Sequence, residues 1–225
     1  MSTKSPLNSY ELIATAVPGA IVIFAATFVA PELREYFGKD APSIGGFGLF
    51  LIMAYIVGQL LQSGGNLLEA IVWWFFGGMP SAWLQTDRCS KLLSKTQCAA
   101  LDAALQKMLP GCTAIKDIQP DEWKGITRQV FAAVNAAGRA SRVDSFNQTY
   151  GLMRGIGAGF FLAAAAVSVI DIANWKLSAL LAAAGLLATY RMYRFGKHYA
   201  QELFVQYLDY STPSSNGSKA AASKS

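Results

Sequence analysis

The chain has few of the residues from which enzymes build active sites. Among its 225 residues are one histidine, His198, and three cysteines. A single histidine excludes a histidine-rich metal centre and argues against a Ser–His–Asp triad. The glycine-rich stretches lack the Gly-Lys-Ser/Thr ending of a phosphate-binding loop. The sequence therefore predicts a protein that is not an enzyme and that holds neither a cofactor nor a metal ion.

Charged residues are also scarce, at 15% of the chain against 53% hydrophobic residues. Uncharged and predominantly apolar residues fill four stretches, at positions 12–30, 45–65, 155–170 and 177–190. A helix needs about 20 apolar residues to cross the hydrocarbon core of a bilayer. The two shorter stretches are flanked by Arg154, Trp175, Lys176 and Arg191, which can extend them as interfacial anchors. We therefore expect four transmembrane helices rather than the buried core of a soluble protein.

The basic residues lie on one side of these stretches. Nine Lys and Arg residues fall between positions 85 and 149, and Arg191, Arg194 and Lys197 follow the last stretch. The links at 31–43 and 171–176 carry only two and one, offset by acidic residues. Because cytoplasmic loops carry the excess of Lys and Arg, we expect a bacterial inner-membrane protein with both termini cytoplasmic. Topology then explains the net charge of +5, and no nucleic-acid partner is expected.

These patterns predict an all-α membrane protein with four transmembrane helices and a helical cytoplasmic insert between helices two and three. Residues 1–84 would hold the first transmembrane pair and an interfacial aromatic segment, and residues 85–146 the insert. Residues 147–210 would hold the second pair with a cytoplasmic helical extension, and residues 211–225 a disordered tail. For residues 66–84, a re-entrant segment and a fifth transmembrane span remain alternatives to the interfacial helix. No proline interrupts residues 121–174, so the last insert helix either runs into the third span or bends at a glycine.

The three cysteines, Cys89, Cys98 and Cys112, all fall in the expected insert. An odd number of thiols in a reducing compartment argues against a disulfide framework. A zinc site would lack a fourth ligand nearby. We therefore expect free thiols.

The third stretch and its flank carry small residues at intervals of four: Gly151, Gly155, Gly159 and Ala163. This spacing places them on one helix face, where another backbone can approach closely. The partner is either a second copy or the fourth stretch of the same chain, with its Ser178, Ala182 and Gly185. The pattern predicts tight helix packing and leaves homo-oligomerisation open.

The second stretch and its flank carry polar residues on one face: Gln59, Gln62, Ser63, Asn66 and Glu69. At about 100° per residue they fall within roughly 120° of a helix. Because polar groups facing lipid are costly, this stripe should face protein or water. It either bonds to a neighbouring helix or lines an aqueous path in an assembly of several copies. For Glu69 alone, solvation at the interface is a third alternative.

Basic residues at the membrane edge are candidates for lipid contact. Arg154 either reaches the lipid phosphates or forms an ion pair with Glu69, which should lie at a similar depth. Arg191, Arg194 and Lys197 recur at helical spacing, and such juxtamembrane clusters attract anionic lipids. The lipid bilayer, including its anionic lipids, is therefore an expected partner.

The sequence as a whole favours an oligomeric pore-forming or membrane-perturbing effector controlled through its cytoplasmic domain. A second copy of the chain is then the main protein partner. The alternative is a membrane-anchored sensor or scaffold that recruits a cytoplasmic protein. A small-solute transporter ranks third, since four spans without an inverted repeat are few for that task.

Overall fold

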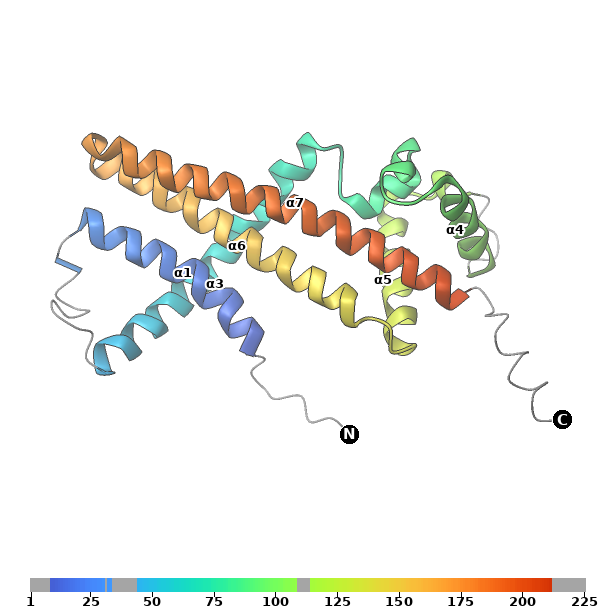
Figure 1. The fold of residues 1–225 in the computed structure, drawn as a ribbon, viewed down its shortest axis with the longest axis horizontal. Helices are drawn as coiled ribbons and strands as arrows, with labels where there is room; N and C mark the ends of the chain where they lie inside the picture. The colour runs from blue at the N-terminus through green and yellow to red at the C-terminus, as the bar shows by residue number, and fades with distance from the viewer. Residues whose placement is uncertain (1–8, 31, 34–43, 109–113, 212–225) are drawn as a thin grey trace. The chain divides into compact units, whose positions relative to one another are not determined.

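The chain folds into helices in a computed structural model that describes residues 9–30, 32–33, 44–108 and 114–211. No strand occurs within these ranges. Four helices are long and apolar enough to cross a membrane: α1 (Ser9–Val29), α3 (Ile44–Phe75), α6 (Ser141–Ile170) and α7 (Trp175–Ser211) (Figure 1). An all-helical fold with four candidate spans therefore agrees with the sequence analysis. The disordered tail is predicted from residue 211, whereas Ser211 is the last residue of α7; residues 212–225 lie outside the described residues.

Two compact units make up the chain. The span unit comprises the described residues of Met1–Phe75 together with Gln148–Arg194. The insert unit comprises the described residues of Phe76–Asn147 and of Phe195–Ser225. α7 thus contributes its first part to the span unit and its last part to the insert unit.

In the span unit, α6 and α7 form an antiparallel pair. The 3-10 helix η4 (Ile172–Asn174) joins them, and the Asp171 carboxylate accepts a hydrogen bond from the Ala173 N–H at 3.2 Å. The Ser178 hydroxyl donates to the Ala164 carbonyl across the pair at 2.9 Å. Such cross-helix hydrogen bonds satisfy polar groups that lipid cannot.

α3 is longer than a bilayer core requires. Its 32 residues, at about 1.5 Å per residue, span roughly 48 Å against a hydrocarbon core of about 30 Å. The aromatic segment is its last two turns, where Trp74 is 76% exposed and Phe75 73% exposed. The helix ends at Phe75. Gly77 and Gly78 follow it with φ angles of 74° and 96°, which are readily adopted only by glycine.

The insert unit is built from short helices around an aromatic and aliphatic core. Its elements are η1 (Pro80–Gln85), η2 (Asp87–Lys91), α4 (Lys95–Met108), η3 (Ile115–Asp117), α5 (Pro120–Ala136), the start of α6 and the end of α7. The Trp123 ring stacks on Phe204 with centroids 6.1 Å apart, and its indole N–H donates to the Ser81 carbonyl at 3.0 Å. Leu101 and Leu203 are fully buried. This unit thus has a core of its own.

The long proline-free segment does not form one rod. α5 ends at Ala136 and α6 begins at Ser141. Between them Gly138 takes a φ of 73°, a left-handed conformation that commonly ends helices. Of the two alternatives, the structure has the bend.

The expectation of free thiols is wrong for two of the three cysteines. Cys89 in η2 and Cys98 in α4 form a disulfide, with their Cα atoms 6.3 Å apart and nine residues of sequence separation. The turn between the two helices brings both sulfurs together, which neither the odd cysteine count nor the expected compartment could reveal. Cys112 lies outside the described residues.

Candidate functional site

The glycine face of α6 packs mainly against α1. A Cβ on Gly155 would lie 2.9 Å from Pro18 Cγ, and one on Gly159 would lie 3.0 Å from the Pro18 carbonyl oxygen. Ala163 is buried, whereas a Cβ on Gly151 would meet no described atom within 4 Å. The partner of this face is therefore the first helix of the same chain, and neither of the partners anticipated from the sequence. The fourth span meets a different glycine, Gly157, at Thr189.

Two glycines that the sequence analysis did not single out bring α1 and α3 into backbone contact. A Cβ on Gly19 would lie 1.8 Å from the Ala54 carbonyl oxygen, and one on Gly58 would lie 1.9 Å from that of Thr15. Neither position has room for any side chain. The spacing of Ala54 and Gly58, four residues apart, was the available signal, since small residues at that interval share a helix face.

The polar stripe of α3 divides into an inward part and an outward part. On the inward part, Glu69 accepts a hydrogen bond from Arg154 Nη1 of α6, and Gln62 Oε1 lies 3.4 Å from Arg154 Nη2. The side chains of Glu69 and Arg154 are only 20% and 21% exposed. Arg154 thus makes the ion pair that the sequence analysis held as the alternative to lipid contact. Its aliphatic carbons pass over Gly65, where a Cβ would lie 3.3 Å from Arg154 Cγ.

An aromatic cluster lies one turn beyond the ion pair. The Trp73 indole N–H donates to the Tyr150 hydroxyl at 2.8 Å, and the two rings stack at 6.4 Å. Tyr193 of α7 meets Trp73 with centroids 5.6 Å apart. Three spans therefore meet at this point through side chains that combine apolar area with hydrogen bonding.

The outward part consists of Gln59, Ser63 and Asn66, all exposed. Gln59 donates a hydrogen bond to the Tyr55 hydroxyl of its own helix at 2.9 Å. Among the described residues, neither Ser63 nor Asn66 has a side-chain hydrogen-bond partner. We call these three residues the α3 polar face. Within the uncharged run at 41–68, they present groups that lipid cannot satisfy.

The basic residues of α7 remain at the surface or close to it. Arg191 and Arg194 are exposed in the span unit, and Lys197 is half-buried in the insert unit. Their roles as lipid or interface charges stay predictions, because the structure contains no bilayer.

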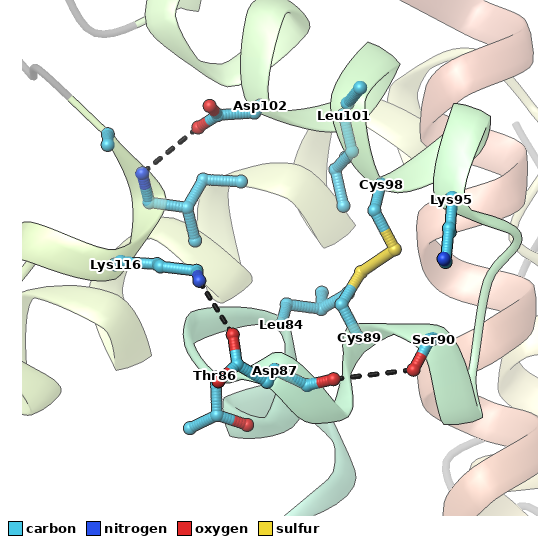
Figure 2. A pocket seen from close by; sticks show the side chains of 13 residues that line it. Leu84, Thr86, Asp87, Cys89, Ser90, Lys95, Cys98, Leu101, Asp102 and Lys116 are labelled. Carbon is cyan, nitrogen blue, oxygen red and sulfur yellow. Dashed lines mark hydrogen bonds and ion pairs between the residues drawn. A yellow bond between two sulfur atoms is a disulfide. The ribbon is translucent and has the colours of Figure 1, made fainter.

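The insert unit contains a pocket of about 370 Å³ beside the disulfide (Figure 2). Its apolar lining includes Leu84, Leu101 and Ile115. At its edge the Lys116 ammonium donates to the Asp87 carboxylate at 2.8 Å. This hydrogen bond and the positive charge of Lys116 hold the pKa of Asp87 below its usual range. The same hydrogen bond and the negative charge of Asp87 raise the pKa of Lys116.

No cluster of three His, Cys, Asp or Glu side chains suited to a metal ion occurs in the described part of the chain. No family model, curated protein or solved structure matches this chain. The function must therefore be argued from the sites above.

Proposed function

We propose that this protein is a non-enzymatic, multi-pass membrane protein whose copies assemble through the α3 polar face and enclose a polar path across the bilayer. The observation that carries the proposal is the exposure of Gln59, Ser63 and Asn66 on a helix apolar enough to span a membrane. Such residues normally face a bundle interior or a water-filled cavity. In a single copy of this chain they face neither.

The other candidate surfaces for assembly are already occupied within one chain. Gly155 and Gly159 contact Pro18, and Glu69 pairs with Arg154. The α3 polar face is the candidate surface that remains available for contact with a second copy. Its extension toward the N-terminal end of α3 supports a close approach by another helix. Gly45 and Gly48 lie on the same side at helical spacing, and a Cβ on either would meet no described atom within 4 Å.

The charge distribution supports an orientation for the assembly. We place the insert unit and both termini on the cytoplasmic side of a bacterial inner membrane, because the stretch from position 85 to 149 carries nine Lys and Arg residues. Exposed Arg191 and Arg194 would then contact anionic lipids. Control of the path through the cytoplasmic unit follows from this orientation.

Ion flux across liposomes tests the proposal. We expect full-length protein to carry ions and the double variant Gln59→Leu/Asn66→Leu to fall to the level of protein-free liposomes, because leucine removes the groups that solvate an ion. Leu60→Ala is the matched control: Leu60 is 72% exposed on the same helix, but about 100° around it from Gln59. Its flux should equal that of the wild type. Wild-type flux at the protein-free level, or full flux in the double variant, would contradict the proposal.

A membrane-anchored sensor is the second candidate function, favoured by the 370 Å³ pocket in the insert unit. A volume of this size accepts a small molecule. Absence of flux together with specific ligand binding by the insert unit would favour the sensor over the pore.

A further inference from the structure

The pocket of the insert unit is bordered by the Cys89–Cys98 disulfide. Both cysteines line the pocket and both are partly exposed. Thiol–disulfide exchange requires a thiolate to reach one of the two sulfur atoms, so a fully buried disulfide is inert. This disulfide faces a space that a small molecule can enter (Figure 2).

The surroundings of the two sulfurs differ. Cys98 lies near the start of α4, which begins at Lys95, and a helix N-terminus stabilises negative charge. Lys95 precedes Cys98 by three residues, a spacing that puts both on one helix face, and both line the pocket. Lys95 has no ion-pair partner among the described residues. Cys98 is therefore the better leaving group, and Cys89 the sulfur to be attacked.

We propose that Cys89–Cys98 is a redox-active pair that exchanges with a small thiol carrying a carboxylate, bound in this pocket. The thiolate of the first molecule attacks Cys89 Sγ and forms a mixed disulfide. The Cys89–Cys98 bond breaks, and its electron pair leaves on Cys98 Sγ, which then takes a proton. A second thiol molecule attacks the mixed disulfide and releases Cys89. Two thiols are thus oxidised to one disulfide while the protein pair is reduced to two thiols.

The pocket has the chemistry that such a ligand needs. Leu84, Leu101 and Ile115 accept the aliphatic body. The lining holds two cations and two carboxylates. Lys116 is paired with Asp87, and Asp102 accepts hydrogen bonds from the Ile115 N–H and the Gln106 side chain. The Lys95 ammonium, without an ion-pair partner among the described residues, is therefore the group that favours an anion. This inference rests on the insert unit alone and does not depend on assembly through α3.

Glutathione is a suitable probe, with full-length protein in nanodiscs and Cys112→Ser to leave only the pair. The reduced fraction is measured by alkylating the free thiols and determining the mass of the protein by mass spectrometry. We expect reduction of the folded protein without denaturant. We expect Lys95→Gln to slow it about threefold, the effect of losing one exposed charge worth about 0.7 kcal/mol. Lys124→Gln is the matched control, an exposed lysine paired with Asp121 and outside the pocket lining, and should leave the rate unchanged.

A variant that fills the pocket tests whether the thiol reaches the disulfide through the pocket and not from another exposed side. Ala99 lines the pocket and is exposed, so Ala99→Trp should block reduction in the folded protein but not in denaturant. Three results would each overturn the proposal: reduction of the wild type only in denaturant, an unchanged rate in Lys95→Gln, or an unchanged rate in a folded Ala99→Trp variant. Since Lys95 is exposed, its substitution tests the proposal even where Ala99→Trp does not fold.

Discussion

At the scale of single residues, Arg154 is a charged side chain that links two helices of the span unit. Its guanidinium contacts Glu69 and Gln62 across the α3–α6 interface, while its Nε is buried without a hydrogen-bond partner among the described atoms. Removing either member of a largely buried pair leaves the other charge without compensation, which costs more than the pair itself contributes. The ion pair therefore fixes the register between α3 and α6.

A double-mutant cycle measures this coupling. We expect Glu69→Gln and Arg154→Gln each to lower the thermal unfolding midpoint in detergent, and the double variant to lose no more than the worse single variant. A coupling of about 1–3 kcal/mol is expected, within the range for contacting residues in one ion-pair network. The same cycle on Asp121 and Lys124, 96% and 73% exposed, is the control and should be additive. Additivity at Glu69 and Arg154 would show that the contact is not energetically coupled.

At the scale of elements, the span unit is held together more by the close packing of α1 against α3 and α6 than by the hydrogen bonds of the polar stripe of α3. Gly19 and Gly58 let the backbones of α1 and α3 touch where a side chain would not fit, and Pro18 packs on Gly155 and Gly159 of α6. Within a bilayer, van der Waals contact of this kind replaces the hydrophobic effect as the force between helices. α1 thus joins α3 to α6.

Two glycines of α3 provide a matched pair of variants for this packing. Gly58→Ala places a Cβ 1.9 Å from the Thr15 carbonyl oxygen, and overpacking of this kind costs about 1–3 kcal/mol. Gly64→Ala meets no described atom within 4 Å and improves helix propensity by up to about 1 kcal/mol. We expect Gly58→Ala to lower the unfolding midpoint and Gly64→Ala to leave it unchanged or raise it. Equal midpoints would mean that α1 and α3 do not pack as described.

The sequence predicts these elements better than it predicts their partners. Uncharged runs of about 20 residues mark spans because the bilayer imposes that length, and the common depth of Glu69 and Arg154 made their pairing foreseeable. That Pro18 faces Gly155 is set by how three helices cross, which no local pattern encodes. The Cys89–Cys98 disulfide was missed for a similar reason, since it depends on the turn between η2 and α4.

At the scale of the whole molecule, the chain combines a span unit with an insert unit that has its own core. In the described part of the span unit, Ser178, Glu69 and Trp73 find hydrogen-bond or ion-pair partners on a neighbouring helix. Ser63 and Asn66 of the α3 polar face have no side-chain partner among the described residues. In lipid, a single copy would leave the side chains of Ser63 and Asn66 without hydrogen-bond partners. The proposed assembly would supply those partners.

Disulfide cross-linking in native membranes shows whether two copies meet at the α3 polar face. A cysteine replaces Ser63 in a chain whose three native cysteines are changed to serine, and Leu180→Cys on α7, at a residue 68% exposed, serves as the control. We expect mild oxidation to convert the Ser63→Cys chain to a species of twice its mass and to leave the Leu180→Cys chain monomeric. A Ser63→Cys chain that stays monomeric, or that cross-links no faster than the Leu180→Cys control, would contradict it.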